Sequence, residues 1–116
     1  MDDFTDELET ISKYENNINS LKSNYQEKED ISKKLIKEHF PPPQITYDRF
    51  IDEIDDCNRL FYNQIDLTLN IIDMAPGLTN KALDELKKKV KILTSLKEEI
   101  GNLVVELTNN SSDISG

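Results

Sequence analysis

The residues of this sequence that could do chemistry gather in one short acidic run, which comprises Asp52, Glu53, Asp55 and Asp56. Glu53 and Asp56 stand three residues apart, so a helix would place both carboxylates on one face. Proteins bind Mg²⁺ through one or two carboxylates together with water molecules. The spacing therefore makes Glu53 and Asp56 the candidate ligands of a metal site. A solvated acidic face of a helix explains the same run, and it is the interpretation we prefer.

A second pair of carboxylates would strengthen the metal hypothesis. The Glu53–Asp56 spacing resembles one half of the magnesium site of all-α nucleotide pyrophosphohydrolases, which carry E-x-x-E and E-x-x-D pairs on two facing helices. The other half has no counterpart, because Asp84-Glu85 and Glu98-Glu99 are adjacent pairs. The resemblance implies a magnesium-dependent hydrolase as the alternative function. Our preferred expectation is a protein with no catalytic residues, no cofactor and no metal.

The sequence has a single cysteine, Cys57, and a single histidine, His39. One cysteine can form neither an internal disulfide nor a cysteine-based zinc site, and one histidine is too few for a di-iron bundle with Glu-x-x-His pairs on two helices. Cys57 falls on an apolar helix face, which predicts a buried small side chain. His39 falls at a helix end, so we do not expect the two to form a nucleophilic pair. Glycine-rich phosphate loops and Gly-x-Ser-x-Gly turns do not occur in the sequence.

The charge balance is strongly acidic, with a formal net charge of −9 and a pI near 4.5. Nucleic-acid backbones and anionic membranes attract clustered Lys and Arg, so neither is an expected partner. A small basic run, Lys87, Lys88, Lys89 and Lys91, is interpreted as a solvated face that could dock an acidic helix. The acidic first ten residues do not resemble a secretion signal, and no window approaches the roughly 18 apolar residues of a membrane span. These features favour a cytoplasmic protein.

The acidic run lies inside the stretch that organises the rest of the chain, residues 47–74. Apolar and semi-polar residues recur there in steps of three and four, which is the helical period. The face is wider than the seam of a two-stranded coiled coil, so this helix should pack against more than one neighbour. Its residues are Tyr47, Phe50, Ile51, Ile54, Cys57, Phe61, Ile65, Thr68, Ile71 and Ile72, widened by Leu60, Leu67 and Leu69.

Helices are predicted at about 3–39, 46–75 and 79–108, followed by a flexible polar tail over 111–116. The prolines at 41–43 separate the first two helices. Pro76 and Gly77 end the second, with Gly77 in the left-handed position just after the helix. Thr46 and Thr79 are the predicted N-caps of the second and third helices, and Leu78 and Leu83 stand where a hydrophobic staple would form. Gly101 suggests a close approach of another helix.

Charge placement predicts how the helices are arranged. If the chain folds back at the prolines, residues whose numbers sum to about 85 face each other. The lysines Lys28, Lys33, Lys34 and Lys37 then fall near Asp48, Asp52, Asp55 and Asp56. The predicted fold is an all-α, up-down-up bundle of three long antiparallel helices, coiled-coil-like, forming one domain over residues 1–110. Oligomerisation would cover apolar surface that three helices leave exposed.

Half of the chain resembles the helical hairpins of Mediator-type coiled-coil subunits, in which a Pro-Gly turn separates two long helices. The resemblance rests on the acidic helix YDRFIDEIDDCNRLFYNQIDLTLNIIDMAPGL and the apolar-seamed helix NKALDELKKKVKILTSL. The first forty residues do not follow that pattern. The resemblance implies a helical hairpin, and we do not assign the chain to that family.

The expected function is a non-catalytic interaction or assembly module whose partner is a second copy of the chain or another helical protein. The reason is the excess width of the apolar faces. The predicted partner-binding residues are Phe50, Phe61, Ile65, Ile72, Leu93, Leu96, Ile100 and Leu103. The alternatives are the magnesium-dependent hydrolase using Glu53 and Asp56, and a regulator that binds a basic partner through its acidic faces.

Overall fold

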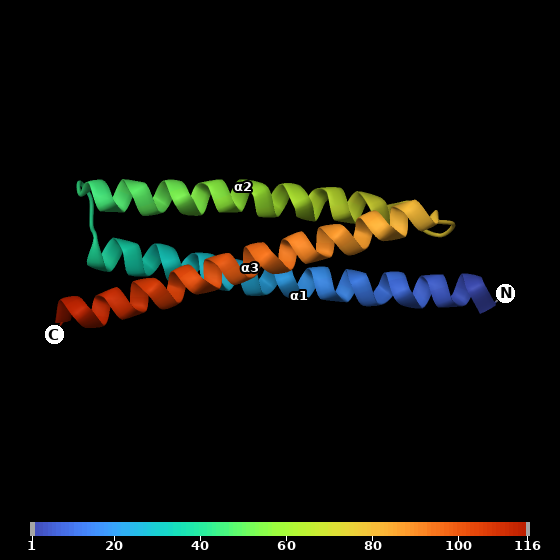
Figure 1. Cartoon of the computed structure of the whole chain (residues 1–116), viewed down its shortest axis with the longest axis horizontal. Helices are drawn as coiled ribbons and strands as arrows, with labels where there is room; N and C mark the ends of the chain where they lie inside the picture. The colour runs from blue at the N-terminus through green and yellow to red at the C-terminus, as the bar shows by residue number, and fades with distance from the viewer. Residues whose placement is uncertain (1, 116) are drawn as a thin grey trace.

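The computed structural model describes the backbone of residues 2–115 and the side chains of residues 5–109. Within this range the chain forms three helices, α1 (Asp2–His39), α2 (Ile45–Asp73) and α3 (Asn80–Ser115). The molecule measures 63 by 21 by 16 Å, and α2 runs antiparallel to both α1 and α3 (Figure 1). The predicted all-α, up-down-up bundle of three long helices is therefore confirmed.

The turn between α1 and α2 places the start of α2 one residue earlier than predicted. The N–H of Gln44 donates to the carbonyl of Pro41 at 3.2 Å, which closes a turn across the prolines. Gln44 then takes an extended conformation and precedes the helix without a capping side chain. The prediction that Thr46 caps α2 is wrong, because the proline turn directs the chain into the helix before Thr46 is reached.

The turn between α2 and α3 agrees more closely with the prediction from the sequence. The N–H of Ala82 donates to Thr79 Oγ1 at 3.1 Å, so Thr79 caps α3 as predicted. Leu78 and Leu83 both pack against the core. Gly77 has a φ of +92°, but α2 already ends at Asp73 with Met74 as its cap. Gly77 therefore uses the left-handed region inside the connecting turn, and its predicted position just after the helix is wrong.

The core is one apolar cluster to which all three helices contribute, and α3 packs most extensively against α1. In α1 the buried face passes through Ser32 and Ile36, whereas Ile31 and Leu35 are only partly buried. The reason is that Tyr25 and Ser32 stand two helical turns apart and so share one face. The buried face thus continues through a stretch where apolar residues are sparse.

The third helix is longer than predicted and has more space around Gly101 than predicted. Its backbone continues to Ser115, past the predicted end at 108, and the side chains of the predicted tail at 111–116 lie outside the described residues. A Cβ added at Gly101 would meet nothing within 4 Å, so the expectation that this glycine admits a closely approaching helix is wrong. Within residues 2–115, none of the helices combines the length and hydropathy that a membrane span requires.

Candidate functional site

Glu53 and Asp56 both lie on the exposed surface of α2. Asp56 accepts a hydrogen bond from the Arg59 guanidinium of its own helix at 3.2 Å. Glu53 instead borders a small cavity between α2 and α3, where Glu99 is the acidic residue contributed by α3. Among the described residues, no three potential ligands from His, Cys, Asp and Glu gather closely enough to hold a metal ion. The metal site at Glu53 and Asp56 stays a prediction that no contact of these two residues supports.

The cavity beside Glu53 is too small for a substrate. Its volume is about 10 Å³, which is room for roughly one water molecule. Cys57 also lines it and is a free thiol of intermediate exposure. Burial raises the pKa of the Cys57 thiol, which keeps the thiol protonated and lowers its nucleophilicity.

Cys57 and His39 lie in different parts of the bundle. His39 ends α1, and the antiparallel arrangement that brings Tyr25 to Asn58 places His39 opposite the first turn of α2. Cys57 lies about ten residues further on, which is ~15 Å along a helix. The two side chains therefore do not form a nucleophilic pair, as expected from the sequence.

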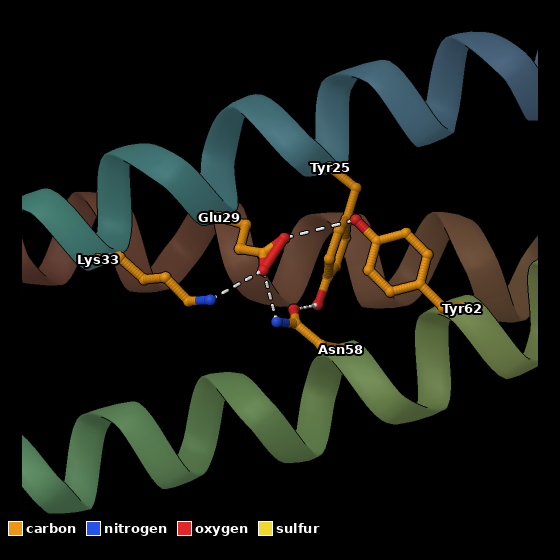
Figure 2. Close-up of polar contacts among 5 residues, drawn as sticks. All are labelled: Tyr25, Glu29, Lys33, Asn58 and Tyr62. Carbon is orange, nitrogen blue, oxygen red and sulfur yellow. Dashed lines mark hydrogen bonds and ion pairs between the residues drawn. The ribbon is translucent and has the colours of Figure 1, made fainter.

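A polar cluster joins α1 to α2 halfway along the bundle (Figure 2). Its members are Tyr25, Glu29, Lys33, Asn58 and Tyr62. The Tyr25 hydroxyl donates to Asn58 Oδ1 at 2.6 Å, and Asn58 Nδ2 donates to Glu29 Oε2 at 2.6 Å. The Tyr62 hydroxyl donates to Glu29 Oε1 at 3.4 Å. The Lys33 ammonium lies 3.2 Å from Glu29 Oε2.

The aromatic members of the polar cluster are held by packing as well as by hydrogen bonds. The Tyr25 ring stacks on Phe61 with 3.8 Å between centroids and meets Tyr62 edge to face at 5.8 Å. Burial raises the pKa of the Tyr25 hydroxyl and, to a smaller extent, that of Tyr62. Both hydroxyls are therefore neutral donors at physiological pH, and Glu29 is the acceptor on which the cluster converges.

The polar cluster connects α1 to α2 through the Glu29 carboxylate. Both oxygens of Glu29 already accept hydrogen bonds, so the carboxylate has no oxygen left without a partner. Lys33 was one of the lysines predicted to face the aspartates of α2. It pairs instead with Glu29 of its own helix. A buried or half-buried polar network of this kind fixes the register of two helices, since any shift along the axis would break all of its bonds together.

The eight predicted partner-binding residues belong to the core. Phe61 and Leu93 are fully buried, and the other six are at most 9% exposed. They are Phe50, Ile65, Ile72, Leu96, Ile100 and Leu103. These side chains hold the three helices of one chain together, so they do not offer a surface to a partner while the bundle is closed. The faces were wide because each helix packs against two neighbours.

A different set of apolar residues remains at the surface of α2. Leu60 is 57% exposed, Leu67 is 39% exposed and Met74 is 67% exposed, and these three stand at intervals of seven residues. Gln64 and Ile71 lie between them and are of intermediate exposure. We call these five residues the outer stripe. Their alternating steps of four and three are typical of the contact positions of a coiled coil.

The sequence contains a signal for the outer stripe. The prediction that Leu60 and Leu67 widen the single buried face of α2 is wrong, because both side chains are exposed. A count at seven-residue intervals that includes Met74 would have separated them as a second, parallel row. Which of the two rows faces the other helices does not follow from spacing alone.

Comparisons with protein-family models, with curated proteins and with solved structures gave no match to this chain. These comparisons therefore add no support to the resemblance to Mediator-type hairpins or to that to helical pyrophosphohydrolases.

Proposed function

We propose that this chain is a non-catalytic helical interaction module whose contact surface is the outer stripe of α2. The supporting observation is a row of apolar side chains at coiled-coil spacing that stays exposed in the bundle, namely Leu60, Leu67 and Met74. Scattered exposed apolar residues are ordinary on protein surfaces, whereas aligned ones mark interaction sites. An amphipathic helix of a partner would cover this row.

Burial of the outer stripe against a partner helix would be favourable. Completing the burial of a half-exposed leucine or methionine is worth about 1 kcal/mol. Three such side chains in line, with Ile71 beside them, supply the apolar centre that a helix–helix contact needs. The polar residues beside the row would form the rim of that contact.

Site-specific photo-crosslinking in cells tests the proposal. A benzophenone-bearing amino acid replaces Leu67, and the same replacement at Val105 is the control, because Val105 is an exposed apolar residue of α3 outside the outer stripe. We expect a covalent adduct with another protein chain from position 67 and none from position 105. Absence of an adduct at 67, or equal adducts at both positions, would contradict the proposal.

We also propose a reducing, cytoplasmic location, in which the single thiol of Cys57 would stay unoxidised. Microscopy of a fluorescent fusion protein checks this assignment, and accumulation in an oxidising compartment would overturn it.

A further inference from the structure

The first half of α1 contacts the other two helices along a single row of residues. Between residues 5 and 20, the side chains that are not exposed are Glu7, Ile11, Tyr14 and Ile18. Their steps of four and three place about one contact residue in each turn of the helix. Tyr14 is itself only half-buried and borders an open hollow of about 250 Å³. Leu8, outside the row, is 44% exposed. This half of α1 therefore buries little apolar surface for its length.

The second half of α1 packs along a wider face. From residue 25 to 40, buried and half-buried residues include the neighbouring pairs Lys28 and Glu29, Ile31 and Ser32, and Leu35 and Ile36. Two contact residues in a turn cover more of a neighbouring helix than one does. Tyr25, whose ring stacks on Phe61, lies at the boundary between the narrow row and the wide face.

The two halves of α1 also differ in their helix propensity. Nine of the twenty residues from 5 to 24 are Asn, Ser or Thr, whereas Ser32 is the one such residue from 25 to 39. These residue types form helices less readily than Lys, Glu, Gln or Leu, because their side chains compete for backbone hydrogen bonds. The first half is therefore weaker both in its packing and in its own helical backbone.

The antiparallel register shows what the first half of α1 covers. Tyr25 stacks on Phe61 of α2. Moving seven residues along both helices, which is about two turns, replaces this pair with Ile18 and Thr68, and both are fully buried. Thr68 belongs to the buried face of α2 together with Ile72. The first half of α1 thus covers the carboxyl-terminal part of that face.

A polar contact holds the outer end of this half. The Glu7 carboxylate accepts hydrogen bonds from the backbone N–H of Gly77 at 3.0 Å and of Leu78 at 2.7 Å, which ties α1 to the turn between α2 and α3 (Figure 1). The inner end is held by the polar cluster (Figure 2). The segment between these two ties separates from α2 and α3 only if the Glu7 contact breaks, whereas the polar cluster can stay closed.

We propose that residues 5–24 of α1 form a strap that opens and closes as a unit over the buried face of α2, with Glu7 as its latch, while the rest of the bundle stays folded. Local opening of this kind occurs where a segment has few buried contacts. Ile72 is one of the residues predicted from the sequence to bind a partner, and the closed strap keeps it covered. The strap lies on a face of α2 other than the outer stripe, so this inference does not depend on the proposed function.

Hydrogen exchange of the unmodified chain tests whether the strap opens separately. After correction for intrinsic rates, the amides of residues 8–24 should exchange at one common rate, about tenfold or more faster than those of residues 28–39. Equal protection of the two halves would mean that α1 opens only with the whole bundle, and it would overturn the inference. Protection that rises evenly from residue 8 to residue 39 would indicate fraying from the end and would also overturn it.

Thiol labelling at two buried positions reports the same opening. Thr68→Cys places a thiol beneath the strap, and Ser32→Cys places one in the second half of α1. Both residues are fully buried, both changes insert a side chain of similar size, and Cys57→Ala removes the native thiol from each variant. The thiol at position 68 should react about tenfold or more faster than the one at position 32. Equal rates, with helical circular dichroism retained, contradict the strap.

A matched pair of core substitutions shows which contacts the opening breaks. Ile18 and Ile36 are both fully buried, and Ile18 lies in the strap whereas Ile36 does not. Ile18→Val should speed labelling at position 68 by about fivefold. Ile36→Val should speed labelling at position 32 by about fivefold and leave position 68 unchanged, because the contacts of Ile36 survive the opening of the strap. If Ile36→Val speeds both positions equally, the whole bundle opens and the inference is wrong.

Glu7→Ala tests the latch in the same assay. The variant should speed labelling at position 68 by about fivefold, because the open strap no longer competes with the hydrogen bonds to Gly77 and Leu78. Glu9→Ala is the control at an exposed position of the same helix, and it should leave the rate unchanged. Equal rates in the two variants would overturn the assignment of Glu7 as the latch.

Discussion

At the residue scale, Tyr25 connects α1 to α2 both by ring packing and by a hydrogen bond. Its ring stacks on Phe61, and its hydroxyl donates to Asn58. Burial raises the pKa of Tyr25 above the ordinary value of 10.0, and it also raises the pKa of Tyr62 and of Cys57, the latter from 9.0. The folded bundle therefore keeps these three groups protonated at an alkaline pH at which the unfolded chain would ionise them.

This clustering predicts a loss of stability at alkaline pH. Because the pKa values are higher in the folded state, the unfolded chain binds fewer protons above about pH 9 to 10, and the free energy of unfolding falls as pH rises. Below that range the contribution is complete. Urea unfolding between pH 7 and pH 11 should show this decline.

Tyr25→Phe should make the alkaline decline shallower, since it keeps the stacked ring and removes one of the ionisable groups. At pH 7 the same variant should lose about 1 kcal/mol with its hydrogen bond to Asn58. Tyr47→Phe is the control for removal of a tyrosine outside the polar cluster. If the free energy of unfolding of Tyr25→Phe falls with pH as steeply as that of the unchanged chain, Tyr25 does not cause the decline.

At the scale of the elements, two glycines have opposite roles. Gly77 lies in the turn between α2 and α3 with a φ of +92°, a conformation that side-chain-bearing residues rarely adopt. Gly101 lies inside α3, where glycine weakens a helix relative to alanine. A Cβ at either position would meet nothing within 4 Å, so backbone conformation alone decides what a side chain does there.

The same substitution should therefore have opposite effects at the two sites. Gly101→Ala should raise the free energy of unfolding by about 0.5–1 kcal/mol, and Gly77→Ala should lower it by about 1 kcal/mol. Each variant removes one glycine from the unfolded chain, so each serves as the control for the other. Urea titration measures both, and a change of the same sign at both sites contradicts the assignment.

At the scale of the whole molecule, contacts between distant parts of the chain tie α1 to the α2–α3 hairpin. The Glu7 carboxylate accepts hydrogen bonds from the backbone N–H of Gly77 at 3.0 Å and of Leu78 at 2.7 Å. The polar cluster around Glu29 makes the second connection, about six turns further along α1. The amino-terminal part of α1 is thereby fixed to a turn that lies at the far end of α2.

Glu7→Ala should lower the free energy of unfolding by about 1 kcal/mol relative to Glu9→Ala. Glu9 is an exposed residue of the same helix, so the comparison removes the effect of alanine on helix propensity. Hydrogen exchange at the amides of Gly77 and Leu78 should accelerate in the Glu7 variant only. Equal stability and unchanged exchange in the two variants would show that the Glu7 contact contributes nothing.

Much of the fold could be predicted because its causes are local. The helical period identified three helices, the prolines at 41–43 identified the first turn, and Thr79 identified the start of α3. The opposing register of α1 and α2 also agreed with the prediction, since Tyr25 lies opposite Asn58 and Phe61. The predicted cap of α2 is wrong although its cause is also local, because the turn closed between Gln44 and Pro41 starts the helix before Thr46.

Sequence spacing is enough to show which residues of α2 share a face, because position along a helix sets direction around its axis. Which of these faces is covered depends on the tertiary packing. The row from Ile54 to Ile72 is buried and the row from Leu60 to Met74 is exposed, although both are largely apolar and both have helical spacing. The physical reason is that burial depends on where α1 and α3 lie around α2, and their positions are fixed by contacts such as those of Glu7 and Glu29 with residues far away in the chain.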